Sequence, residues 1–148
     1  MSMGIEEVLN TTGSYVYTNV GTSMMPLLRE HRDVMVIRKK DAGKRPRRLD
    51  VVLFRRPGRR DYVLHRIMRV NDDGTYWIMG DNCMTGETVA EDNVLGILEA
   101  VVRDGKHVPV TSPAFRLYSH LWCDAYPVRV ALQRLRRRLR GALRGARG

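Results

Sequence analysis

The 148-residue chain lacks the features that mark several large protein classes. Its two cysteines are too few for a disulfide scaffold and cannot by themselves form a four-ligand zinc site. The longest apolar runs have four residues, at 34–37, 51–54 and 76–79, whereas a membrane-spanning helix needs about 20. The first ten residues contain Glu6 and Glu7 but no apolar stretch, so they do not resemble a secretory signal. We expect no metal and no cofactor.

Acidic residues are also scarce, because 16 Asp and Glu stand against 26 Lys and Arg, which gives a net charge of +10. The excess lies in two segments, 44–60 with a charge of +7 and 128–148 with +8, so the rest of the chain carries −5. Such basic segments suit nucleic acid, a membrane surface or an acidic partner. Aromatic residues make up only 7% of the chain and form no stacking motif. Specific nucleic-acid binding is therefore not expected.

Short alternating or β-branched segments separated by turn signals predict a mainly β fold. One such signal is the Asp-Gly turn within 71–74, which is typical of a hairpin. Strands of this length at close spacing indicate a sandwich or barrel. The predicted strands cover residues 14–20, 33–38, 49–54, 61–70, 75–79, 94–103 and 106–110, and a short helix is predicted over 4–10.

The C-terminal part of the chain has a helical pattern. Ser112 can cap a helix and Pro113 suits its first position, which predicts a helix over 114–125. Beyond Pro127, apolar residues recur every three or four positions while arginine fills the other face, as in a basic amphipathic helix. The apolar positions are Val128, Leu132, Leu135, Leu139 and Leu143. We therefore divide the chain into a β-rich domain, 1–110, and a helical arginine-rich extension, 111–148.

Four short segments could carry chemistry, although each is ordinary by itself. They are Gly-Thr-Ser-Met-Met-Pro at 21–26, Asp-Val-Val-Leu-Phe at 50–54, Tyr-Val-Leu-His-Arg-Ile at 62–67 and Gly-Asp-Asn at 80–82. In this order they resemble the signal peptidase I family of serine endopeptidases, over roughly residues 14–102. Most bacterial members have lysine where this chain has His65, and a histidine there resembles the endoplasmic-reticulum and archaeal branch. The resemblance implies the β fold that this family shares with SOS-repressor-like proteins.

The resemblance also implies roles for individual residues. Ser23 corresponds to the nucleophile, His65 to the general base and Asp81 to the acid that orients it, while Glu87 stands at the position of a candidate second acid. A serine hydroxyl needs a base during attack, and a neutral imidazole with an ordinary pKa near 6.5 can serve. The sequence therefore predicts an activity that rises through about pH 6.5 and levels off near neutral pH.

The oxyanion of the reaction needs hydrogen-bond donors. The backbone N–H of Ser23 is the expected donor, whereas Gly21 stands where many bacterial members have a hydroxyl, which leaves the Thr22 hydroxyl as a candidate second donor. By resemblance the substrate is an extended signal or leader peptide that pairs with a strand edge, with small residues before the cut. The residues expected to shape the substrate cleft are Met24, Met25 and Pro26.

The family usually has a membrane-spanning helix before the serine segment, and none is present here. We therefore expect a cytoplasmic enzyme, or one attached to the inner face of the membrane through the basic helix. Packing of this helix on its own domain or on a partner is an equal alternative. The arginines expected to contact an anionic surface are Arg134, Arg136, Arg137, Arg138 and Arg140.

Other classes remain as alternatives. A self-cleaving SOS-repressor-like protein would use a Ser–Lys pair, but no lysine lies near position 65, and the cleavage-like pair Ala42-Gly43 follows Ser23 instead of preceding it. A basic nucleic-acid-binding or regulatory module on the same fold would lack peptidase activity. An inactive pseudo-enzyme is disfavoured by the intact set of Ser23, His65 and Asp81.

Overall fold

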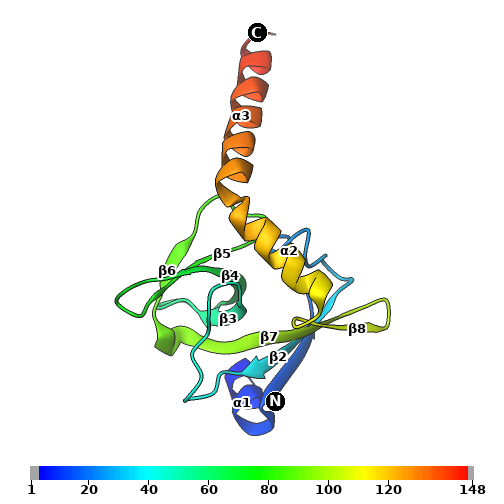
Figure 1. Cartoon of the computed structure of the whole chain (residues 1–148), viewed down its shortest axis with the longest axis vertical. Coiled ribbons are helices and arrows are strands. Elements are labelled where there is room, and N and C mark those ends of the chain that lie inside the picture. Colours follow the sequence, from blue (N-terminus) through cyan, green and yellow to red (C-terminus); the bar gives the residue numbers. More distant parts are fainter. Residues whose placement is uncertain (1–3, 147–148) are drawn as a thin grey trace.

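The computed structural model describes residues 4–146, in which one eight-stranded antiparallel sheet carries a helix before it and two helices after it (Figure 1). The elements in chain order are α1 (Ile5–Thr12), β1 (Ser14–Thr18), β2 (Val34–Lys39), β3 (Val51–Arg55), β4 (Tyr62–Val70), β5 (Tyr76–Met79), β6 (Glu87–Val89), a 3-10 turn (Glu91–Asn93), β7 (Val94–Arg103), β8 (Lys106–Pro109), α2 (Pro113–Asp124) and α3 (Tyr126–Gly145).

The strand order across the sheet is β1-β2-β7-β3-β4-β5-β6, and β8 pairs with the end of β7. The long strand β7 is central, because it pairs with β2 on one side and with both β3 and β8 on the other. The register of β3 against β4 places Val52 opposite His65. The candidate base therefore lies in the interior of the sheet, between β3 and β5.

All seven predicted strands and all three predicted helical segments correspond to elements of the structure. The segment 80–92, for which no strand is predicted, contains the additional strand β6. With about 30% of residues in helices and 32% in strands, the chain is a mixed α and β protein, so "mainly β" understates its helical content. The predicted boundary at 110/111 falls between the end of β8 and the start of α2.

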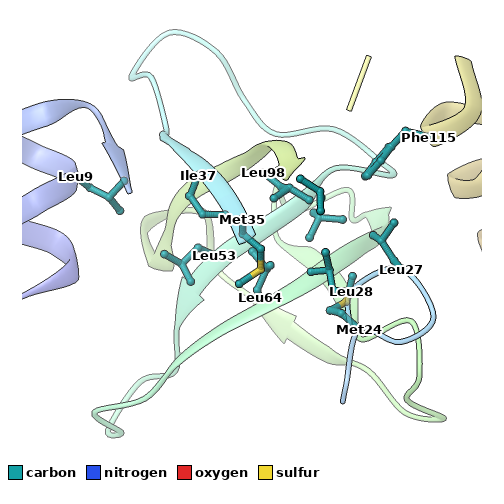
Figure 2. Close-up of a cluster of buried hydrophobic side chains, with 12 residues drawn as sticks. Leu9, Met24, Leu27, Leu28, Met35, Ile37, Leu53, Leu64, Leu98 and Phe115 are labelled. Carbon is teal, nitrogen blue, oxygen red and sulfur yellow. The ribbon is translucent and has the colours of Figure 1, made fainter. Parts of the chain in front are cut away.

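The main apolar core joins the sheet to segments from both ends of the chain (Figure 2). Leu9 of α1 and Phe115 of α2 pack against buried side chains of β2, β3, β4 and β7. Met24, Leu27 and Leu28, which follow Ser23 directly, belong to the same cluster. Burial of one such side chain stabilises the fold by roughly 1.5–3 kcal/mol, so these three residues fix the serine segment to the sheet.

The helix α2 packs on the body, whereas α3 extends away from it (Figure 1). Phe115, Ser119 and Cys123 are buried on α2, but Val130 is the single buried residue of α3. The apolar stripe of α3 is exposed, and its members are Val128, Leu132, Leu135, Leu139 and Leu143. Within residues 4–146, no helix combines the length and the apolar character that a bilayer crossing requires.

The two basic segments differ in how their charge is compensated. Half of the basic residues of 44–60 form ion pairs with acids of the body, namely Arg45, Arg48, Arg55 and Arg56. The arginines of α3 have no ion-pair partner in the part of the chain that the structure describes; they are Arg129, Arg134, Arg136, Arg137, Arg138, Arg140 and Arg144. The uncompensated positive charge therefore concentrates on α3.

Candidate active site

Ser23 lies on an exposed turn that begins soon after β1. Gly21 adopts a φ of +93°, a conformation that favours glycine, so the absence of a hydroxyl at this position follows from the backbone. The N–H of Met25 donates to the carbonyl of Thr22 at 3.1 Å and closes the turn. Ser23 is exposed while the adjacent Met24 is only 2% exposed. The buried methionine thus anchors a turn that presents the serine to solvent.

The loop after β5 holds this turn from the other side. The backbone N–H of Asn82 donates to the carbonyl of Ser23 at 2.8 Å, and its side-chain amide donates to the carbonyl of Thr22 at 3.1 Å. The N–H of Asp81 contacts the Met24 sulfur at 3.4 Å. The Gly-Asp-Asn segment therefore acts as a clamp for the serine turn, which explains physically why the two motifs occur together.

Gly80 lies between the backbone of Ser23 and the ring of His65. A methyl group at this position would lie 2.5 Å from the Ser23 carbonyl oxygen, 2.7 Å from the Cys83 sulfur and 3.0 Å from His65 Nε2. These separations are too short for any side chain, so only glycine allows the three groups to border the same small space. The Ser23 backbone and the His65 ring therefore border one space, although the two residues are 42 positions apart in the chain. Among the described residues, no hydrogen bond joins the Ser23 hydroxyl to His65.

His65 places a buried imidazole beside Gly80. The residue, on β4, is 8% exposed, and its ring lies in an edge-type arrangement with the Phe54 ring, with the two ring centroids 6.1 Å apart. Within residues 4–146, neither ring nitrogen forms a hydrogen bond. Burial lowers the pKa of His65 to about 4, an effect that the Glu87 charge partly opposes and the Arg56 charge reinforces. The imidazole is therefore neutral near pH 7 and free to accept a proton, and the expected inflection near pH 6.5 moves to lower pH.

The carboxylate of Asp81 accepts hydrogen bonds from Arg66 and Tyr118 and not from His65 among the described residues. Both of its oxygens accept hydrogen bonds from the Arg66 guanidinium, at 2.8 and 2.9 Å, and one also accepts from the Tyr118 hydroxyl at 2.9 Å. Arg66 follows His65 on β4, and successive side chains of a strand point to opposite faces. Among the described residues, the expected hydrogen bond from His65 to Asp81 is absent, because the carboxylate serves Arg66 on the other face of the strand.

Arg66 is the centre of a buried polar network. Its side chain is fully buried, and besides Asp81 it donates to the carbonyl of Leu49 at 3.0 Å and to the Ser119 hydroxyl at 2.8 Å. Arg66 on β4 therefore contacts three different parts of the chain: the segment before β3, the helix α2 and the loop that clamps Ser23. We infer that Asp81 positions the site through this network and does not touch the base.

Glu87, the candidate second acid, lies on β6 and is held by Arg56. The Arg56 guanidinium donates to both carboxylate oxygens, with its shortest contact at 2.6 Å. Of the two acids, Glu87 is the stronger in raising the pKa of His65. This carboxylate is therefore the main negative charge that would stabilise a protonated His65, although no hydrogen bond joins the two side chains in the described part of the chain.

The donor expected for an oxyanion is free. Across residues 4–146, the backbone N–H of Ser23 has no hydrogen-bond partner. Thr22 is exposed next to it, and Met25 and Pro26 reach the surface on the far side of the turn. An exposed hydroxyl, a neutral imidazole and an unpaired N–H are the groups that acyl transfer requires. No three His, Cys, Asp or Glu side chains converge as metal ligands among the described residues.

Two features of the site went unnoticed in the sequence. Cys83 borders His65 across Gly80, and its place directly after the Gly-Asp-Asn motif could have suggested this. Tyr118 and Trp122 contact Asp81, the latter through a hydrogen bond from its indole N–H to the Asp81 carbonyl at 2.9 Å. Both aromatic residues come from α2, where no motif marks them, so sequence reasoning had no signal for them.

Comparison with known proteins adds no relative. No protein-family model matches the chain, and no curated protein shows significant similarity to it. The function of the chain is therefore inferred from the geometry around Ser23 and His65 and from the motif resemblance.

Proposed function

We propose that this protein is a serine endopeptidase that cleaves a signal or leader peptide, with Ser23 as nucleophile and His65 as general base. The observation that carries the proposal is the approach of His65 Nε2 and the Ser23 backbone across Gly80, next to a Ser23 N–H that has no partner among residues 4–146. The order of motifs along the chain, which resembles that of signal peptidase I, supports the same function. The exposed position of Ser23 suits a peptide substrate.

Each group then has a defined step. His65 Nε2 takes the proton from the Ser23 hydroxyl as its oxygen attacks the scissile carbonyl, and the Ser23 N–H donates to the developing oxyanion. The imidazolium returns the proton to the leaving amine, and an acyl-enzyme remains. Water, deprotonated by the same imidazole, then attacks the acyl carbonyl. The bond to the Ser23 oxygen breaks, the imidazolium returns the proton to that oxygen, and the acid product leaves. The Glu87 charge favours the imidazolium, because it raises the pKa of His65.

A cleavage assay with matched variants tests this proposal. The protein is incubated at pH 7 with a proteome-derived peptide library, and new termini are identified by mass spectrometry. Ser23→Ala and His65→Gln should each lower cleavage by at least about 100-fold, whereas Ser14→Ala and the exposed control His120→Gln should cleave normally. Cleavage by Ser23→Ala at the wild-type rate would refute the mechanism.

We further propose that α3 attaches the protein to an anionic membrane surface. Its exposed leucines form one stripe, and seven arginines that form no ion pair within residues 4–146 flank it, the pattern of a helix that lies in the membrane interface. Sedimentation with vesicles containing phosphatidylserine should recover the full chain and not a Leu135→Glu/Leu139→Glu variant. Equal sedimentation of the two proteins would exclude this role for the leucine stripe.

The alternative, a basic module without peptidase activity, depends on the same arginines. Arginine-rich helices bind phosphate backbones with strong salt dependence. Salt-sensitive binding of single-stranded RNA together with no cleavage of the library would favour that alternative over the peptidase.

A further inference from the structure

A cleft of about 360 Å³ lies between the serine turn and the start of α3. Met25 and Pro26 form one wall, and Trp122 and Leu132 contribute apolar surface from the two helices. Met25 is two residues from Ser23, so a peptide bound at Ser23 reaches this cleft within a few residues. We call it the α3 cleft.

Two buried polar atoms of the α3 cleft have no partner among the described residues. Arg129 and Gln133 both line it, and within residues 4–146 the buried atoms Arg129 Nη2 and Gln133 Oε1 have no hydrogen-bond partner. Buried polar atoms nearly always have partners, and leaving one unpaired costs about 1–3 kcal/mol. One atom is a donor and the other an acceptor, which matches the C=O and N–H that an extended peptide backbone offers.

The position of Arg129 is fixed by its other contacts. Its guanidinium stacks on the Trp122 ring at 4.1 Å and donates through Nε to the Trp122 carbonyl at 3.1 Å and through Nη1 to the Asp81 carbonyl at 3.0 Å. The unpaired Nη2 is therefore held in place by three contacts and does not depend on side-chain freedom. Arg129 also connects the cleft to the loop that clamps Ser23.

The charge of the α3 cleft is positive and uncompensated. Arg129 and Arg136 line it, and no acidic side chain does so among the described residues. Neither arginine has an ion-pair partner within residues 4–146. A ligand with a carboxylate beside an apolar group would complement both the charge and the walls of the cleft.

We propose that the α3 cleft is a specificity subsite of the peptidase, which binds a substrate segment carrying a large apolar side chain next to an acidic one. The apolar side chain packs between Met25 and Leu132, Arg136 pairs with the acid, and the free atoms of Arg129 and Gln133 bond the peptide backbone. The assignment of the segment to a substrate depends on the proposed function, whereas peptide binding itself can be measured without cleavage.

Peptide selection with an inactivated protein tests this subsite. A phage-displayed library of random decapeptides is panned on Ser23→Ala, on Ser23→Ala/Arg136→Glu and on Ser23→Ala/Arg140→Glu. Arg140→Glu is the matched control, because it makes the same charge change on α3 outside the cleft. We expect Ser23→Ala and the control to enrich peptides with an acid beside an apolar residue, and Arg136→Glu to shift that preference at least tenfold toward a basic residue.

A second variant tests the backbone contacts. Gln133→Met removes the acceptor at similar size and should weaken the affinity for an enriched peptide about fivefold, which corresponds to the loss of one hydrogen bond. No enrichment of acidic peptides, or the same preference in both charge variants, would overturn the subsite. If the enriched peptides bind through Arg136 but the wild-type protein cleaves none of them, the α3 cleft is a peptide-binding site and the peptidase proposal fails.

Discussion

Replacing Asp81 by Asn separates a positioning role from direct contact with the base. The substitution keeps the size of the side chain and removes its charge, so Arg66 is left buried without an anionic partner. Removal of one member of a buried ion pair typically costs about 3–5 kcal/mol. A domain of this size has roughly 5–15 kcal/mol of stability, so the variant should remain folded at 25 °C but with a much lower unfolding midpoint.

Urea unfolding followed by tryptophan fluorescence measures this cost. Trp122 stacks on Tyr118 at 5.7 Å and bonds the Asp81 carbonyl, so its emission reports directly on the network. The double variant Asp81→Leu/Arg66→Met removes both charges. Its loss of unfolding free energy should be smaller, by about 2 kcal/mol or more, than the sum of the losses in the single variants Asp81→Leu and Arg66→Met. Asp81→Asn should retain measurable cleavage where it is folded. If instead Asp81→Asn changes stability by less than about 1 kcal/mol and abolishes cleavage, Asp81 acts on His65 directly and our reasoning is wrong.

Four further predictions concern the space around Gly80. Because the pKa of His65 falls from about 6.5 in the unfolded chain to about 4 in the fold, the unfolded chain binds the extra proton between these values. The free energy of unfolding should therefore decrease as pH falls from 6.5 to 4, by up to about 3 kcal/mol; urea midpoints of the wild type and of His65→Gln, measured at pH 7 and pH 4.5, check this decrease. The value of kcat/KM should be level above about pH 5.5, and an inflection near pH 6.5 would contradict this expectation. Alkylation of the half-buried Cys83 by N-ethylmaleimide should block cleavage. The variant Cys83→Ala should cleave normally and resist inhibition by this reagent, because the other cysteine, Cys123, is only 3% exposed. If N-ethylmaleimide inhibits Cys83→Ala as strongly as the wild type, the reactive group lies elsewhere. Gly80→Ala should lower cleavage at least about 100-fold and destabilise the fold by about 1–3 kcal/mol. Gly43 has open space around it, so Gly43→Ala should behave as the wild type. Normal cleavage by Gly80→Ala would show that the close approach of His65 to the Ser23 backbone is not needed.

Much of the fold could be predicted because its signals are local. Alternation and turn residues mark the strands β1 to β5, β7 and β8, and the Ser112–Pro113 pair marks the start of α2: the Ser112 hydroxyl accepts a hydrogen bond from the Phe115 N–H at 3.4 Å. The strand β6 was missed because Glu87–Val89 is too short for alternation to be visible. It exists through pairing with β5, which is a tertiary effect.

The membership of the candidate site stays a prediction, whereas some of its contacts can be compared with the structure. The Ser23 carbonyl and His65 Nε2 border the same space at Gly80, in the Gly-Asp-Asn segment. The motifs did not predict the partner of Asp81, since Arg66 next to His65 competes for the carboxylate more strongly than a neutral imidazole does. The low pKa of His65 also escaped prediction, because it arises from burial in the folded sheet, between β3 and β5 and against Gly80, which is a tertiary effect.

Covalent labelling of the nucleophile tests the central claim most directly. A fluorophosphonate forms a bond between its phosphorus and an activated serine oxygen, with loss of fluoride, and intact-mass analysis with peptide mapping locates the adduct. We predict one adduct, on Ser23, which forms at least about 100-fold more slowly in His65→Gln and at the wild-type rate in His120→Gln. An adduct on another residue, or labelling of Ser23 at a rate that does not depend on His65, would contradict the Ser23–His65 mechanism.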